Sequence, residues 1–341
     1  MEESKFSSPL LDLPEKLVLE VLKHCDYPSI QSLRKVCQNL RDFIDETNVK
    51  CPNQKVSIKF GTDEISICLG DRFTITYRKV KASFWYPWRK QTCMVSTDRK
   101  NYTVKNKFTL TFFNDFDEIL KQLGGPLENL EIILVDLKLL EKFQHYLRHQ
   151  GTLIQTKSLK VQIFDSFIHH QAIILSMDPE HLRTLELVMN TTEATNDFET
   201  TVFVGHYWRA EQWGRLEELK SKGIKVLLHG HRLENILHLS KVDINLAIVE
   251  TENIVEMKQN FLSSGSSKHW RITSRLLPFP EELVESLGQP YENEDNERHR
   301  WFYRVPGGSH ILQIMVSGTL LELKFVERDE VPKNALVQSQ H

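Results

Sequence analysis

Long apolar runs, paired cysteines and catalytic signatures are all missing from this 341-residue sequence. No stretch approaches the roughly 18 consecutive apolar residues of a membrane-spanning helix, so we expect no membrane partner. The opening "MEESKFSSPLLDLPEK" is acidic and has no apolar centre, so we expect no secretory signal peptide. The five cysteines are an odd number without a Cys-x-x-Cys spacing. Reduced thiols in a cytoplasmic or nuclear protein are therefore expected rather than disulfides.

Motifs that cradle phosphates or carry hydrolytic residues are also missing. The chain has no G-x-G-x-x-G, G-x-x-x-x-G-K-[ST], H-E-x-x-H or G-x-S-x-G. We therefore expect no catalytic residues and no cofactor.

The histidines are the only residues that suggest a metal site. His169 and His170 would diverge by about 100° on a helix, whereas His229 and His231 would share one side of a strand. Zinc needs three or four well-placed ligands. The preferred interpretation is that these histidines, His238 included, lie on the surface or in the groove of the repeats, and no metal is expected.

Apolar residues make up 40% of the chain and charged residues 26%, with a net charge of −3, which is typical of a folded globular protein. The length has room for two or three domains. The pattern of the sequence divides it at residues 8–52, 53–113, 114–330 and a tail at 331–341.

Residues 10–45 read as two amphipathic helices. Pro14 suits the first position of one helix, Tyr27-Pro28 interrupts the chain, and Ser29 can cap the second helix. The apolar positions of both follow helical spacing: Leu17, Val18, Val21, Leu22, Cys25, then Leu33, Val36, Cys37, Leu40, Ile44. So short a segment seldom holds a core of its own. Part of this apolar surface must face a partner or the rest of the chain.

After Pro52 the apolar residues alternate, which predicts an antiparallel meander with one buried face. Three runs carry the pattern, and two more are expected to extend it: 56–60, 65–69, 73–77, then 102–104 and 108–112.

From about residue 114 strands alternate with helices. Strands are expected at 127–135, 158–164, 181–188, 224–230 and 244–249. Five helices are expected between and around them: one starting at Asn114 or Asp115, one at Asp136, one at Asp165 or Ser166, one over 206–223 and one around 254–261. The strands resemble the L-x-x-L-x-L phrase of leucine-rich repeats. The expected fold class is α+β: N-terminal helices, an antiparallel β connector, then leucine-rich-repeat-like strand–helix repeats with a C-terminal β-hairpin cap over 299–328. A compact doubly wound sheet is the alternative.

Residues 72–107 carry ten Lys and Arg against one acid, Asp98, around the phrase "SFWYPWRK". Aromatic and basic residues together suit single-stranded nucleic acid and equally suit a protein interface. A solvated face is the third interpretation. The candidate target-binding residues here are Trp85, Tyr86, Trp88 and Arg89.

Residues 12–45, "DLPEKLVLEVLKHCDYPSIQSLRKVCQNLRDFID", resemble an F-box. In that family the segment docks on the Skp-type adaptor of an SCF-type cullin–RING ubiquitin ligase. The alternative is an ordinary helical hairpin packed on its own domain. The resemblance, with the apolar pattern, assigns adaptor binding to Leu13, Pro14, Leu17, Val18, Val21, Leu22, Ile30, Leu33, Val36, Cys37 and Leu40.

Three later phrases resemble the FTH domain of a nematode-expanded F-box family: "EQW" at 211–213, "NFLSSGSSKHWRI" at 260–272 and "LGQPYENEDNERHRWFYRVPGGSHILQI" at 287–314. The resemblance implies a substrate-recognition subunit that performs no bond chemistry itself. Its expected partners are the Skp-type adaptor, the cullin indirectly, and an unknown protein target. The alternative is a non-catalytic nucleic-acid-binding or scaffold-binding protein that uses residues 72–107, although nucleic acid is the less expected partner.

Overall fold

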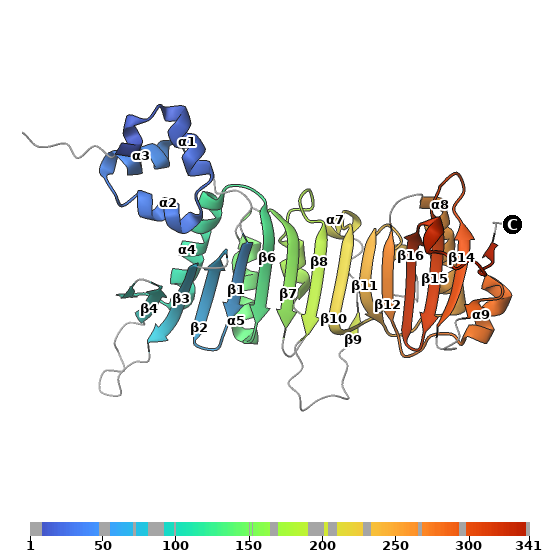
Figure 1. Cartoon of the computed structure of the whole chain (residues 1–341). Coiled ribbons are helices and arrows are strands. Elements are labelled where there is room, and N and C mark those ends of the chain that lie inside the picture. The colour runs from blue at the N-terminus through green and yellow to red at the C-terminus, as the bar shows by residue number, and fades with distance from the viewer. Residues whose placement is uncertain are drawn as a thin grey trace, which may run out of the picture. The chain divides into compact units, whose positions relative to one another are not determined.

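A computed structural model shows the arrangement of the chain (Figure 1). The structure describes residues 9–47, 55–70, 73–80, 92–98, 100–149, 151, 153–163, 170–189, 201–203, 210–227, 233–264, 268–292 and 298–338. The chain forms two compact units. The first comprises Met1–Val161 with Ala172–His181, and the second comprises Gln162–Gln171 with Leu182–His341.

The first unit begins with a short 3₁₀ turn, η1 (Pro9–Asp12), and three helices, α1 (Glu15–Lys23), α2 (Tyr27–Leu33) and α3 (Gln38–Thr47). Two helices were expected, but the second apolar stripe is interrupted: Leu33 ends α2, Val36 and Cys37 lie in the following turn, and Leu40 and Ile44 belong to α3. If α2 and α3 were one continuous helix, the Arg34 carbonyl would accept a backbone N–H. In this structure it accepts a hydrogen bond from Arg41 Nε at 3.0 Å instead, at the turn between the two helices.

The helix starts also differ from the sequence prediction. Pro14 is the N-cap of α1, with extended backbone angles, rather than its first helical residue. Ser29 is not the cap of α2. Asp26 is the cap, and its Oδ1 accepts the backbone N–H of Ser29 at 2.9 Å. A carboxylate three residues upstream satisfies an otherwise unpaired N–H, and proline tolerates the first turn that follows.

The predicted meander is confirmed as β1 (Lys55–Phe60), β2 (Glu64–Leu69), β3 (Phe73–Val80) and β5 (Asn101–Val104), and the sequence missed β4 (Thr92–Thr97) between the last two. β1 also pairs in parallel with β6 (Leu127–Leu134). The strand expected at 108–112 is wrong, because α4 (Phe108–Leu123) already begins there. Its apolar residues suit a strand over five positions, but Phe112 and Phe116 stack one helical turn apart, with ring centroids at 5.5 Å.

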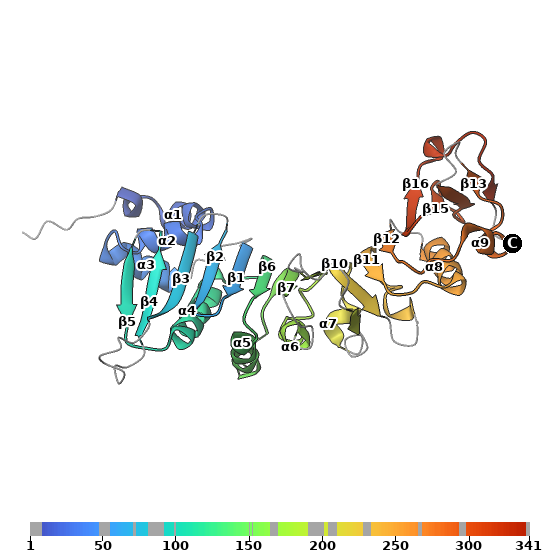
Figure 2. The same cartoon turned by 90° about the horizontal axis from the view of Figure 1, so that it is seen from below.

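The core of the first unit lies between the sheet and two helices, α4 and α5 (Leu137–His149), which Figure 2 shows along one side of the strands. Phe60 of β1 contacts Phe112 of α4 at 5.7 Å and Phe143 of α5 at 4.8 Å between ring centroids. All three side chains are fully buried. β7 (Thr156–Ile163) and α6 (His170–Leu175) follow.

The second unit contains a mixed set of strands. β8 (Thr184–Met189), β10 (Glu218–Leu227), β11 (Lys241–Leu246) and β12 (His269–Thr273) pair in parallel in that order, and β9 (Thr201–Phe203) also pairs with β10. β16 (Leu320–Val326), β15 (Ile311–Ser317) and β14 (His299–Arg304) continue in antiparallel order from β12. β13 (Tyr291–Glu292) and β17 (Val337–Gln338) both pair with β14.

The helices of the second unit are α7 (Glu211–Gly214), α8 (Thr251–Ser264) and α9 (Pro280–Leu287), with short 3₁₀ turns η4 (Leu233–Asn235) and η5 (Arg328–Glu330). The long helix expected over 206–223 is wrong. Over residues 210–223, the described part of that range, only α7 is helical, and β10 begins at Glu218. Leu219 and Ile224 bury on the sheet, and Gly223, at φ +70°, accommodates the irregularity between them.

The α+β class is confirmed: N-terminal helices precede a mixed sheet with further helices. Residues Val331, Ala335 and Val337 of the C-terminal segment pack against a buried cluster of Phe302, Ile311 and Val326. Across the described part of the chain, no helix has the length and apolar character needed to span a membrane.

Candidate functional site

Helix α1 presents two adjoining apolar stripes, and the protein buries only one of them. Val18 and Leu22 are 1% and 0% exposed, whereas Leu17 and Val21 are 52% and 44% exposed. Each pair is one helical turn apart, and the two stripes are offset by about 100° around the helix axis. The helix is therefore apolar over more of its circumference than its own fold uses.

The buried stripe faces the interior of the three N-terminal helices. Ile30 of α2 and both Leu40 and Ile44 of α3 are buried as well. Four of the eleven residues assigned to adaptor binding therefore lie inside the unit: Val18, Leu22, Ile30 and Leu40. Spacing could not separate these from the surface residues, because both sets share the helical period.

The remaining seven residues are accessible to different degrees. Leu13, Pro14, Leu17, Val21 and Val36 are exposed, and Leu33 and Cys37 are half-buried. Val36, in the turn between α2 and α3, is 60% exposed. An aliphatic surface of this kind, defined by Leu13, Leu17, Val21 and Val36 and called here the helical apolar surface, is typical of protein interfaces. Contact with an adaptor remains a prediction for these residues.

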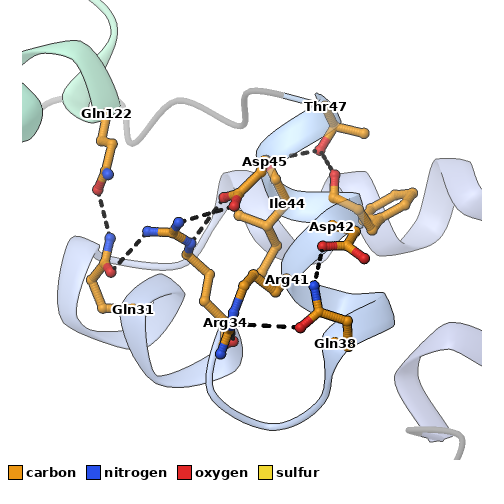
Figure 3. Close-up of polar contacts among 10 residues, drawn as sticks. Gln31, Arg34, Gln38, Arg41, Asp42, Ile44, Asp45, Thr47 and Gln122 are labelled. Atoms are coloured by element: carbon orange, nitrogen blue, oxygen red, sulfur yellow. Dashed lines mark hydrogen bonds and ion pairs between the residues drawn. The ribbon is translucent and has the colours of Figure 1, made fainter.

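A polar network holds the turn that displays Val36 (Figure 3). Arg34 Nε lies 2.9 Å from Asp45 Oδ1, and Arg34 Nη2 donates to Asp45 Oδ2 at 3.0 Å. Gln38 Nε2 donates to Asp42 Oδ1 at 2.6 Å on the adjacent turn of α3. The charged hydrogen bond from Nη2 is stronger than one between neutral groups, so it ties the end of α2 to α3.

Helix α2 also contacts the rest of the first unit. Gln31 Nε2 donates to Gln122 Oε1 of α4 at 2.5 Å (Figure 3), and the rings of Tyr27 and Phe73 lie 6.4 Å apart. A cavity of about 310 Å³ lies beside these contacts, and Tyr77 and Asp115 are part of its lining.

The half-buried Asp115 and the buried Tyr77 form a polar pair in the lining of that cavity. The Tyr77 hydroxyl donates to Asp115 Oδ2 at 2.9 Å. Burial raises the pKa of the Asp115 carboxyl although this hydrogen bond opposes the shift, and burial together with the carboxylate raises the pKa of the Tyr77 hydroxyl. The pair joins α4 to β3.

The proposed aromatic residues of the basic segment, Trp85, Tyr86, Trp88 and Arg89, lie outside the described residues. The described part of the segment is partly neutralised, because Arg78 pairs with Glu64 at 2.8 Å and Lys79 lies 3.7 Å from Asp63. Lys100 Nζ lies 5.7 Å from the centre of the Tyr102 ring.

One row of side chains across the strands of the second unit carries alternating charge. Across β8, β10, β11, β12 and β16 of the second unit, directly paired residues form one row: Glu186, Lys220, Asp243, Arg271 and Glu322. The pKa of Lys220 is raised chiefly by its hydrogen bond to Glu218, in which Lys220 Nζ lies 2.8 Å from Glu218 Oε1. The carboxylates of Glu186 and Asp243 raise it further. Each charge has an opposite charge beside it, so this row attracts neither an acidic nor a basic partner strongly.

Among the described residues no group of three metal-ligating side chains comes together. His169, His229 and His231 lie outside the described residues, and His170 begins α6. Nε2 of His238 lies 3.0 Å from the Trp213 carbonyl oxygen. Because a carbonyl oxygen can only accept, Nε2 is the donor. Burial lowers the pKa of this imidazole.

Sequence reasoning missed one set of exposed apolar residues. Ile248, Leu276 and Phe279 of the second unit are 37%, 59% and 70% exposed. The signal was present in the run "LLPFP" at 276–280, which is apolar throughout and yet lies between a strand and a helix.

Comparison with known proteins adds two domain matches. The F-box domain family matches residues 10–52, and the FTH domain family matches residues 137–288. "F-box A protein 224" of Caenorhabditis elegans is 24% identical over 323 residues, which cover 90% of this chain and 77% of that protein. No solved structure matches. Both resemblances derived from the sequence are confirmed, and the FTH match ends before the C-terminal strands β14–β16.

Proposed function

We propose that this chain, an F-box protein of the FTH-domain type, is the substrate-recognition subunit of an SCF-type ubiquitin ligase. The F-box binds the Skp-type adaptor, and the adaptor links the chain to the cullin. The FTH region binds a protein target. The chain contributes proximity, because holding a target beside the ligase makes ubiquitin transfer effectively intramolecular.

The helical apolar surface is the observation that supports this proposal most directly. Had the fold covered Leu17, Val21 and Val36, the three helices would have had little apolar surface left for an adaptor. They are instead 52%, 44% and 60% exposed. Several aliphatic side chains left exposed on three short helices are typical of a surface that binds a partner.

The repeat-like architecture belongs to the same proposal. We propose that the parallel strands and helices after residue 114 form leucine-rich-repeat-like units, closed by the antiparallel strands β16, β15 and β14. Stacked repeats offer long, continuous surfaces, and an antiparallel end shields the last apolar face from solvent. The ligase reaction takes place in the cytoplasm or nucleus.

The test is co-purification of the full chain with a Skp-type adaptor. Leu17→Asp combined with Val21→Asp places two carboxylates on the helical apolar surface, and burying unpaired charge opposes binding strongly. We expect loss of the adaptor from the purified complex. The control is Leu110→Asp, which changes a leucine of similar exposure, 46%, on α4 and should leave the adaptor bound. Undiminished adaptor binding by the double variant would reject the proposal.

A further inference from the structure

An apolar surface lies on two neighbouring connections of the second unit. β11 and β12 run in parallel and are directly paired, so the connections that leave their C-terminal ends, residues 247–250 and 274–279, start at the same edge of the sheet. The Val249 N–H donates to the Leu276 carbonyl at 3.1 Å, which joins the two connections. Ile248, Leu276 and Phe279, called here the apolar edge, are exposed on them. Connections at this end of parallel strands are common binding sites.

Phe279 has no evident role in the fold. Its side chain is 70% exposed, and it occupies the N-cap of α9 without a side-chain capping hydrogen bond. Ser, Thr, Asp or Asn at this position would satisfy a free N–H at the helix start. The protein therefore forgoes a favourable cap for an aromatic ring that faces solvent. Aromatic rings of this kind are the usual anchors of protein interfaces.

The connection that carries Phe279 is stiff. Pro278 precedes it and Pro280 follows it as the first residue of α9. Proline fixes its own φ and restricts the residue before it to extended conformations, and Phe279 has φ −66° and ψ 148°. A surface whose backbone is already ordered loses less conformational entropy on binding.

Carboxylates outnumber cations around the apolar edge, where four carboxylates stand against one exposed cation, Arg275. Glu250 and Glu252 lie beside Ile248 at the start of α8, and Glu281 and Glu282 follow Phe279 at the start of α9. All four are exposed. The helix dipoles favour carboxylates at both sites, and together they give the apolar edge a negative border that the alternating row on the strands lacks.

We propose that the apolar edge binds an extended segment of the ubiquitination target whose apolar anchors are flanked by Lys or Arg. This inference rests on the proposed function, since it names the chemistry of the target. Apolar anchors cover Leu276 and Phe279, and the basic flanks meet the four carboxylates. Charge complementarity speeds association and selects against acidic partners.

The test uses the full chain bound to its adaptor and three sets of fluorescent synthetic peptides. The first set has a Leu/Phe centre with Lys/Arg flanks, the second has the same centre with Asp/Glu flanks, and the third has a Ser centre with Lys/Arg flanks. We expect binding by the first set only, weakened by added salt. Phe279→Ser and Leu276→Ser should each weaken it about tenfold.

Leu336→Ser is the matched control, because Leu336 is 69% exposed on the same unit but away from the apolar edge in sequence; its affinity should equal that of the unaltered chain. Serine is also a better N-cap than phenylalanine, so the thermal midpoint of Phe279→Ser should be unchanged or higher, which separates lost binding from lost folding.

Three outcomes would each overturn the inference: equal binding of the first two peptide sets, binding by no peptide of the first set, or full affinity of Phe279→Ser. Adaptor retention, scored on the same preparations, tests the proposed function separately: a chain that keeps its adaptor but shows no peptide selectivity refutes the apolar edge alone.

Discussion

Two leucines of α1 provide a direct test of which apolar stripe serves a partner. Leu17 is 52% exposed and Leu22 is 0% exposed, although they lie on the same nine-residue helix. Leu17→Ala and Leu22→Ala remove the same atoms. The first should affect binding to the adaptor, and the second should affect folding.

The magnitudes follow from burial. Fully burying a leucine contributes about 1.5–3 kcal/mol. Because Leu17 keeps about half of its surface exposed in the free chain, its coverage by an adaptor contributes about 0.8–1.5 kcal/mol, or a roughly 4- to 13-fold change in Kd. Leu22→Ala leaves a cavity and should lower the free energy of unfolding by about 2–5 kcal/mol.

Calorimetric titration with purified Skp-type adaptor gives the affinities, and urea unfolding followed by circular dichroism gives the stabilities. Leu17→Ala should stay within about 0.5 kcal/mol of the unaltered chain in stability. The reasoning fails if Leu17→Ala destabilises the fold as much as Leu22→Ala does. It fails equally if Leu17→Ala binds the adaptor with unaltered affinity.

Two further predictions concern the second unit. Burial lowers the pKa of His238 from 6.5, so the neutral ring stabilises the fold fully above pH 6.5 and this contribution is lost as the pH falls through the folded pKa. His238→Gln retains an N–H for the Trp213 carbonyl but cannot be protonated. The free energy of unfolding, measured by urea titration, should therefore fall less in this variant as the pH is lowered below 6.5. An unchanged dependence on pH would contradict the role given to His238. Gly223 has φ +70°, and a Cβ there would lie 2.6 Å from the Met189 carbonyl oxygen, so Gly223→Ala should destabilise by at least about 1–2 kcal/mol in thermal unfolding. Gly214→Ala, with no atom within 4 Å of the added Cβ, is its control, and equal effects of the two would exclude a steric cause.

Much of the local structure was predictable from periodicity. Alternation at Val56, Ile58 and Phe60 identified β1 because every second residue of a strand faces the core. The helical spacing of Leu140, Phe143 and Leu147 after Asp136 identified α5 in the same way. Such patterns are local, so the sequence displays them in full.

The wrong predictions arose where a short apolar run fits two structures. Residues 108–112 alternate like a strand, but the rings of Phe112 and Phe116 pack on Phe60 and Phe143 only from a helix. Residues 216–223 resemble a helix rich in Glu and Lys, but pairing with β8 and β11 draws them into β10. Partners distant in sequence decide such cases, because tertiary packing outweighs propensity differences of tenths of a kcal/mol.

The sequence by itself determined that the opening helices hold more apolar surface than they can bury, and that strands and helices alternate behind them. Only the tertiary structure decided which side chains remain outside. Leu17 and Val18 are adjacent apolar residues of one helix, yet one is 52% exposed and the other 1%. Exposure depends on which neighbours pack against a residue, and the folded chain alone places those neighbours. The same reason hid Phe279 from sequence analysis: the apolar run 276–280 reads as interior until the fold places Phe279 at the surface.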